Sequence, residues 1–228
     1  TPVIAVVTTI DLEHLDCYRD FDDIRNAFTQ FVNKVPFFGS AVLSIDDRGV
    51  QSILPGVERR IVTYGFSRQA DIRAENAVFS GLSSRFEVII DGASAGTVSM
   101  EVPGRHNIRN ALAAIAVARE MGVPFETAAG ALEEFRTVER RFEIKGEAAG
   151  IVVVDDYAHH PTEIEASLDG ARGGFDRRIV AVFQPHLYSR TRDFHEEFGR
   201  AFMNADVLVV TDVYPARESP IEGITGRL

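Results

Sequence analysis

Three short apolar runs in the second half of the chain each end in a cluster of polar residues. The runs are residues 151–154, 179–183 and 207–210, and helical patterns lie between them. Alternating strand and helix patterns predict a parallel sheet, and open parallel sheets place their ligand sites beyond the carboxyl ends of the strands. We therefore expect an α/β fold in which these runs form a three-stranded parallel sheet with one shared polar rim.

The first half of the chain shows the same alternation, followed by a different pattern. Strands are expected at 3–8, 40–45 and 60–65, with helices at 21–34, 46–54, 106–121 and 125–135. Either Asp20 or Asp22 would cap the helix at 21–34, and its apolar face would consist of Ile24, Phe28, Phe31 and Val32. Residues 70–103 read as small antiparallel hairpins appended to the parallel sheet.

The polar block from Arg136 to Arg141 carries no helix signal, so we place a domain boundary near residue 137. The expected domains are 1–137 and 138–228, and a hairpin of 142–146 with 150–155 opens the second one. The chain starts directly with a strand and stops in a loop after the last expected strand, so we expect it to be a fragment with two partial domains.

Composition limits the classes of function. A hydrophobic fraction of 45% predicts a folded core, and the net charge of -10 argues against a general nucleic-acid surface. No apolar run approaches the roughly 18–20 residues that span a membrane. The single cysteine, Cys17, excludes an internal disulfide and fits the cytoplasm. Neither lysine follows a glycine, so the chain contains no G-x-x-x-x-G-K-[ST] phosphate loop.

The turn after residue 154 contains two acids, a phenol and two imidazoles. In this turn Asp156 could accept hydrogen bonds from ribose hydroxyls, and His159 could contact a carboxylate or phosphate. Alternatively, the acids only end the strand and Pro161 opens a helix. A metal hydrolase built on His159 and His160 is a weaker alternative, because adjacent histidines readily point apart and no H-E-x-x-H spacing occurs.

Four further segments have both a functional and a structural interpretation. Arg190 would anchor an anion or begin a helix facing water. The Arg140–Arg141 pair would clamp phosphate or form a solvated charge pair. Asn107 and Asn110 share a helix face that suits an adenine edge, or they cap the helix. His14, just past the first strand, would ligate a divalent metal or belong to a polar turn.

Taken in order, these motifs closely resemble the Mur ligases of peptidoglycan synthesis. The resemblance rests on Gly104-Arg105-His106-Asn107, Arg140-Arg141-Phe142-Glu143, Asp155 to Glu163, Gln184 to Thr191 and Asp212 to Ala216. The forms D-D-Y-A-H-H-P and Q-P-H-x-Y-S-R-T are typical of the member that joins L-alanine to UDP-N-acetylmuramate. By resemblance, the chain begins inside the central ATP-binding domain, after its phosphate loop, and ends within a Rossmann-like third domain.

The resemblance implies a cytoplasmic, ATP- and Mg²⁺-dependent amide ligase that serves cell-wall synthesis, cell shape and cell division. The family reaction passes a phosphoryl group from ATP to the substrate carboxylate, and the amine of alanine then attacks the acyl phosphate. The implied roles are Mg²⁺ binding for His14, adenine contacts for Asn107 and Asn110, ATP phosphate for Arg141, ribose for Asp156, carboxylate binding for His159 and Arg190, and pocket lining for Tyr157 and His186.

Two residues depart from the family pattern T-N-I-x-x-D-H-x-D, which here has Thr9 and Glu13 in place of asparagine and aspartate. Thr9 has a shorter polar reach and lacks the amide donor, whereas Glu13 keeps the charge and moves it by one methylene. Two alternatives stay open: another Mur-type amino-acid or peptide ligase, and a non-catalytic nucleotide-binding module. We expect the 228 residues alone to show no alanine-dependent ATP hydrolysis.

Overall fold

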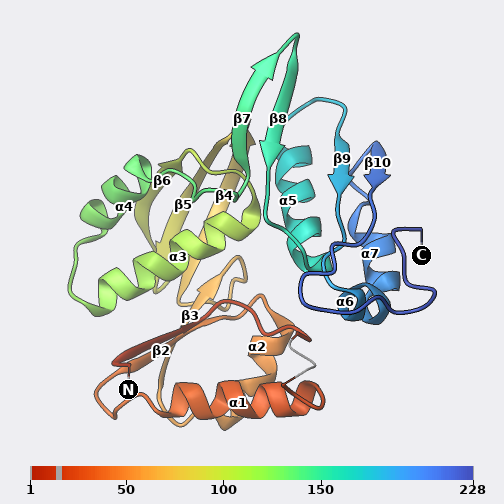
Figure 1. Ribbon diagram of the computed structural model, residues 1–228. Coiled ribbons are helices and arrows are strands. Elements are labelled where there is room, and N and C mark those ends of the chain that lie inside the picture. The colour runs from red at the N-terminus through yellow and green to blue at the C-terminus, as the bar shows by residue number, and fades with distance from the viewer. Residues whose placement is uncertain (1, 14–16, 228) are drawn as a thin grey trace. The chain divides into compact units, whose positions relative to one another are not determined.

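The computed structural model describes residues 2–13 and 17–227, which form two compact units of α/β architecture (Figure 1). Unit 1 comprises Thr1–Val78, Ser84–Met100 and His106–Phe135, and unit 2 comprises Phe79–Ser83, Glu101–Arg105 and Arg136–Leu228. Each unit is described below by itself.

Unit 1 is built on one six-stranded sheet with the strand order β1-β2-β3-β4-β5-β6. The strands are β1 (Ile4–Val7), β2 (Ser40–Ser44), β3 (Arg60–Gly65), β4 (Ile72–Ser80), β5 (Ser83–Ile90) and β6 (Ala93–Met100). The pairs from β1 to β4 are parallel, whereas β5 and β6 are antiparallel. The expectation that antiparallel strands within 70–103 extend the parallel sheet is therefore confirmed.

The helices of unit 1 are α1 (Phe21–Asn33), α2 (Arg48–Ile53), α3 (Arg105–Glu120) and α4 (Phe125–Glu134), with a short 3₁₀ helix η1 (Leu54–Gly56) after α2. Asp20 caps α1 by accepting a hydrogen bond from Asp23 N at 2.9 Å. Of the expected apolar face, Ile24 and Val32 are buried, whereas Phe31 is 40% exposed. The exposed Cys17 precedes α1.

The start of β1 requires a glycine in the neighbouring segment. A Cβ on Gly39 would lie 2.1 Å from the carbonyl oxygen of Val3. The same oxygen accepts a hydrogen bond from Ser40 N at 3.1 Å. The close backbone approach and the first bond between β1 and β2 thus depend on the absence of a side chain at position 39.

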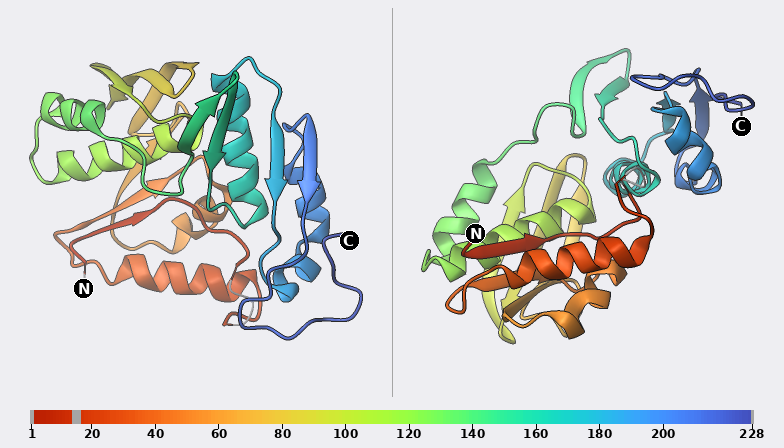
Figure 2. Two further views of the ribbon diagram at one scale, coloured as in Figure 1. Left: turned by 45° about the horizontal axis from the view of Figure 1, so that its top comes forward. Right: turned by 60° about the horizontal axis from the view of Figure 1, so that its bottom comes forward.

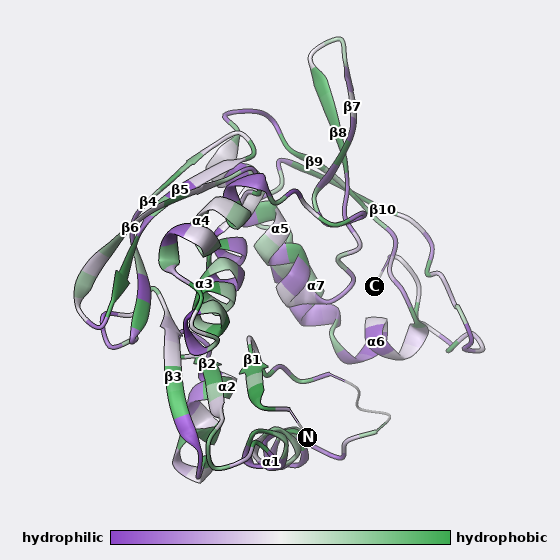
Figure 3. Cartoon of the chain, turned by 90° about the vertical axis from the view of Figure 1, so that its left-hand side faces the viewer, coloured by the Kyte–Doolittle hydropathy of each residue, from purple (hydrophilic) through white to green (hydrophobic). Residues whose placement is uncertain are grey.

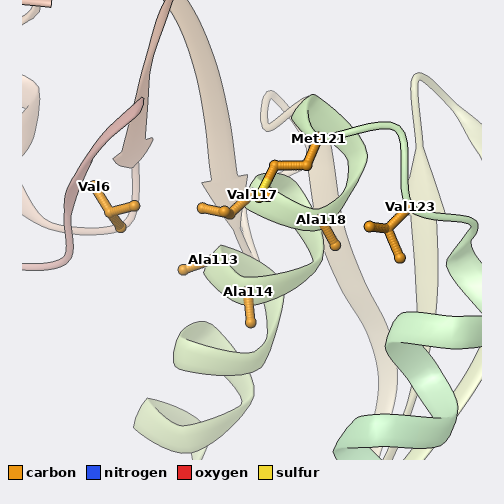
Figure 4. A pocket seen from close by; sticks show the side chains of 7 residues that line it. All are labelled: Val6, Ala113, Ala114, Val117, Ala118, Met121 and Val123. Carbon is orange, nitrogen blue, oxygen red and sulfur yellow. The ribbon is translucent and has the colours of Figure 1, made fainter. Parts of the chain in front are cut away.

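An apolar groove of about 480 Å³ lies between β1 and α3 (Figure 4). Seven residues line it: Val6, Ala113, Ala114, Val117, Ala118, Met121 and Val123. None of these side chains carries a titratable or hydrogen-bonding group, so the groove has no chemistry of its own.

Unit 2 contains two separate two-stranded sheets. β7 (Glu143–Ala148) pairs antiparallel with β8 (Ile151–Asp155), and β9 (Val180–Phe183) pairs parallel with β10 (Val207–Val210). The expected hairpin of 142–146 with 150–155 is therefore confirmed, whereas the expected three-stranded parallel sheet is wrong. Ala149 and Gly150 both have positive φ, which makes a tight two-residue hairpin, so β8 pairs locally with β7.

The helices of unit 2 are α5 (Pro161–Gly174), α6 (Tyr188–Asp193) and α7 (His195–Ala201). α5 and α7 pack against each other, and β9 lies beside β10 (Figure 2). Apolar residues of β8 face solvent, with Ile151 66% and Val153 55% exposed, and β8 carries the hydrophobic colour in Figure 3. Within residues 2–13 and 17–227, no helix is both long and apolar enough to cross a membrane.

Candidate functional site

Asp156, at the carboxyl end of β8, holds together three segments of unit 2. Its carboxylate accepts hydrogen bonds from Ala158 N at 2.8 Å, Phe142 N at 3.0 Å and Ser167 Oγ at 2.8 Å. An ionised carboxylate offers about four acceptor positions. Three are already used inside the protein, so Asp156 joins the end of β8, α5 and the turn before β7, and it retains capacity for about one further donor.

The turn that carries the arginine pair has an uncommon backbone. Arg140 and Phe142 have φ values of 57° and 49°, in the left-handed region that costs a non-glycine residue about 1–3 kcal/mol. Phe142 is only 8% exposed, its ring stacks on Phe175 at 6.3 Å, and its amide donates to Asp156. These interactions offset the strain and fix the direction of the intervening Arg141.

Both guanidinium groups lie against the ring of Tyr157. Arg140 Cζ is 4.6 Å and Arg141 Cζ is 5.9 Å from the ring centroid, within the range of cation–π attraction. Tyr157 is 45% exposed, and the His159 ring meets it edge-on at 4.9 Å. The side chains form a positively charged, partly exposed aromatic surface, which suits a planar anionic ligand.

Glu163 links Arg141 to the start of α5. It accepts hydrogen bonds from His159 N at 3.0 Å and His160 N at 3.3 Å, and Arg141 Nη1 donates to it at 3.2 Å. Burial raises the pKa of this carboxyl group, but the hydrogen bonds and the charges of His159 and Arg141 outweigh burial and bring the pKa below its usual value. Glu163 is therefore ionised at neutral pH and positions Arg141 by charge.

The adjacent histidines point in different directions. The Nδ1 atom of His159 lies 2.8 Å from the carbonyl oxygen of Tyr157, and its ring is 6.2 Å from that of His186. His160 is only 5% exposed, and its ring packs edge-on against Phe194 at 5.0 Å. His160 is thus a core residue, which removes the basis for a metal site that uses both imidazoles.

His186, in the loop after β9, and Arg190, in α6, extend the polar surface. The His186 ring stacks on Tyr214 at 5.7 Å, and its Nδ1 atom lies 3.5 Å from Arg190 Nη1. Burial, followed by the positive charges of Arg190 and His159, lowers the pKa of His186. The imidazole is therefore neutral at physiological pH and leaves the guanidinium as the fixed positive charge beside it.

The expected shared rim is confirmed within unit 2, because the ends of β8, β9 and β10 contribute neighbouring rings. It brings together Arg141, Asp156, Tyr157, His159, His186 and Arg190 through the contacts described above. Whether these residues bind the predicted ligands stays a prediction.

Asn107 and Asn110 belong to unit 1, at the beginning of α3. Asn110 Nδ2 donates to Asn107 Oδ1 at 3.4 Å, so the two amides share a helix face as expected. Their contact with adenine stays a prediction. His14 lies outside the described residues, and of its neighbours Thr9 is exposed and Glu13 half-buried.

Sequence reasoning did not assign roles to several residues that shape this surface. Glu163 had a signal, since an acid three residues after a helix cap is typical of helix N-termini. Ser167 and Glu218, which hydrogen-bond to Asp156 and Ser189, had none, because their partners are distant in the chain.

Comparison with known proteins agrees with this organisation. The family model of the Mur ligase middle domain matches residues 1–118, and that of the Mur ligase, glutamate ligase domain, matches residues 140–226. UDP-N-acetylmuramate–L-alanine ligase of Salinibacter ruber is 58% identical over 227 residues, covering 99% of this chain and 48% of the relative. The enzyme of the same name from Geotalea uraniireducens is 52% identical over 225 residues, covering 99% and 49%.

Solved structures show the same likeness. UDP-N-acetylmuramate–alanine ligase MurC from Thermotoga maritima has a TM-score of 0.75 and 31% identity, covering 93% of this chain and 46% of that one. The MurF ligase from Thermotoga maritima in complex with ADP has a TM-score of 0.76 at 20% identity, covering 92% and 48%, and supports the fold alone. The chain spans about half the length of the curated relatives it matches. With the middle-domain model matching more than half of its residues, the chain belongs to the Mur ligase family.

Proposed function

We propose that this chain contributes the nucleotide and acceptor sites of an ATP-dependent ligase that joins L-alanine to UDP-N-acetylmuramate. Residues 1–137 would be part of the central ATP-binding domain, and residues 138–228 part of the C-terminal domain. Relatives more than 50% identical carry that ligase name. The observation that carries the proposal is the convergence of Arg141, Tyr157 and His159 with the His186–Arg190 pair in unit 2.

The nucleotide side of the proposal uses the surface around Tyr157. ATP supplies the phosphoryl group that activates the substrate carboxylate. Arg141 would exchange its contact with Glu163 for ATP phosphate, since a guanidinium binds either anion through paired N–H groups. The remaining acceptor position of Asp156 would receive a ribose hydroxyl. Asn107 and Asn110 would contact adenine.

The acceptor side uses the loop after β9. Arg190, with neutral His186 beside it, would hold the carboxylate of the substrate or of alanine, and His159 would provide a further donor. Preorganised positive groups of this kind lower the cost of bringing anions together and stabilise charge that develops in the transition state. Their chemical work is binding and orientation, because none of these groups needs to become covalently attached.

The magnesium part of the proposal rests on His14, which the structure does not describe. Across residues 2–13 and 17–227, no group of three or more His, Cys, Asp or Glu side chains is arranged to hold a metal ion. We assign no step to Mg²⁺ and keep His14 as its proposed ligand. The proposed substrates and ATP place the reaction in the cytoplasm.

A chimera tests the proposal. The matching segment of the Salinibacter ruber ligase, which is 58% identical over 227 residues, is replaced by these 228 residues. We expect L-alanine-dependent release of ADP in the presence of UDP-N-acetylmuramate, with little release when serine or glycine replaces alanine. A chimera that folds but shows no alanine-dependent release, or no preference for alanine, would contradict the proposal.

Variants in α6 test the assigned roles. Arg190→Ala should raise the KM of one carboxylate substrate by about 10- to 100-fold, the effect of losing a hydrogen bond to a charged group, and leave the KM of ATP unchanged. Arg192→Ala is the matched control, because Arg192 lies on the same helix and pairs with Asp193 at 2.7 Å. If Arg190→Ala and Arg192→Ala have the same KM for each carboxylate substrate, Arg190 is not part of the acceptor site.

A further inference from the structure

The loop after β10 is attached to the loop after β9 beyond the end of the sheet. Tyr214 N donates to Pro185 O at 2.8 Å, and Leu187 N donates to Tyr214 O at 3.0 Å. These bonds form an isolated parallel bridge between His186 and Tyr214, whose rings stack. The backbone on both sides of the His186 imidazole is therefore held by the 211–218 loop.

The start of α6 depends on the same loop. α6 has only six residues, far fewer than a helix needs for stability on its own, and Leu187 before it has a φ of 70° and no capping side chain. Glu218 supplies the missing acceptor. It accepts hydrogen bonds from Ser189 N at 2.9 Å and from Ser189 Oγ, across 29 positions of sequence.

Arg190 follows Ser189 directly, and its guanidinium lies 3.5 Å from the Nδ1 atom of His186. Fixing Ser189 therefore fixes the origin of the Arg190 side chain. We propose that Glu218 is a positioning residue for the acceptor site: by holding Ser189, it places Arg190 and His186 for the substrate carboxylate. This inference rests on the proposed function of Arg190.

The charge of Glu218 supports an indirect role. Burial raises the pKa of this carboxyl group, but the hydrogen bonds from Ser189 outweigh burial and bring the pKa below its usual value, so Glu218 is an anion at neutral pH. An anion repels a substrate carboxylate and is not its ligand. The contribution of Glu218 to carboxylate binding must therefore pass through the residues that it holds.

The first test uses the chimera described above. Glu218→Ala should raise the KM of the carboxylate substrate that Arg190→Ala affects by about tenfold, as expected when a charge-assisted hydrogen bond is lost, with the KM of ATP unchanged. Glu218→Gln keeps one acceptor oxygen and should show an intermediate increase. The control is Glu222→Gln, which alters an exposed glutamate four positions after Glu218 and should match the parent.

The outcomes separate this inference from the proposed function. If Arg190→Ala raises the KM and Glu218→Ala does not, the positioning role is wrong and the proposed acceptor site stands. If neither variant changes any KM, the acceptor site itself is wrong.

A second measurement uses the 228-residue chain and does not depend on activity. Hydrogen exchange of the Ser189 and Arg190 amides should become about tenfold faster in Glu218→Ala than in Glu222→Gln. The side-chain resonances of His186 should shift in Glu218→Ala only. Unchanged exchange and unchanged His186 resonances would overturn the positioning role.

Discussion

Replacing Asp156 by asparagine should destabilise unit 2 even without any ligand. The carboxylate accepts from two backbone amides, Ala158 N through Oδ1 and Phe142 N through Oδ2, and also from Ser167 Oγ. An asparagine side chain has one oxygen and one NH₂ group. Whichever way the amide is turned, one backbone N–H faces another donor and loses its partner.

The size of the effect follows from these contacts. Leaving one partly buried N–H group unsatisfied costs about 1–3 kcal/mol. Asp155, the adjacent aspartate, is the matched control: its carboxylate lies 3.8 Å from Arg140 Nε and 4.0 Å from Lys145 Nζ. Solvent-exposed ion pairs contribute about 0–1 kcal/mol, so Asp155→Asn should have little effect.

Two assays on the 228-residue chain measure the difference. Urea unfolding followed by circular dichroism should show a free energy of unfolding lower by about 1–3 kcal/mol in Asp156→Asn, with an unchanged dependence on urea. Amide exchange at Phe142 or at Ala158, whichever loses its acceptor, should be about 5- to 150-fold faster, which is the same range of energy expressed as a rate ratio. Equal unfolding midpoints in Asp155→Asn and Asp156→Asn, with equal exchange at both Phe142 and Ala158, would refute the role of Asp156 in joining these three segments.

Other consequences concern both units. Burial raises the pKa of Tyr64 to about 12, whereas an unfolded tyrosine ionises near pH 10. The free energy of unfolding, measured with urea, should therefore keep the full contribution of Tyr64 below about pH 10 and fall by about 2–3 kcal/mol towards pH 12. Tyr64→Phe should abolish this fall. Hydrogen bonds from the backbone amide of Ile179 and then from Arg172 lower the pKa of Asp206. The stability that Asp206 contributes is therefore present above about pH 4 and lost as the pH falls through the lowered pKa. In Asp206→Asn, stability followed by circular dichroism should depend less on pH over this acid range. Gly39→Ala should lower the free energy of unfolding by about 1–3 kcal/mol, and with it the midpoint of thermal unfolding, because the new Cβ meets Val3 O. In Gly130→Ala on α4 the new Cβ meets open space, so this variant should raise the free energy of unfolding by about 0.5–1 kcal/mol. A lower thermal midpoint for Gly130→Ala would contradict this reasoning.

The sequence was sufficient to predict most helices and strands because their apolar periodicities are strong. The capping aspartate of α1 illustrates the limit, since Asp20 and Asp22 are equally suitable residues and only the backbone conformation at Asp20 selects it. The grouping of His186 and Tyr214 was predictable from strand ends alone, because parallel strands such as β9 and β10 place the residues that follow them at one edge. His159 lies beside His186 although β8 belongs to a separate hairpin, so the sheet does not explain its position.

Strand pairing was predictable only in part, and long-range contacts were not. The hairpin of 142–146 with 150–155 was expected and is present, but the apolar run of β8 fits a parallel sheet equally well, so its separation from the sheet of β9 and β10 was not expected. The left-handed residues Arg140 and Phe142 likewise look ordinary in sequence. Glu218 reaches Ser189 across 29 positions, and only the tertiary fold determines that distance.

The single, solvent-facing thiol of Cys17 gives spectroscopists a unique point of attachment. A nitroxide coupled there would broaden amide signals close to the amino end of α1 without any prior mutagenesis. Comparing spectra before and after adding ATP would then test whether nucleotide changes the distance between Cys17 and these amides, with reduction of the spin label as the internal reference.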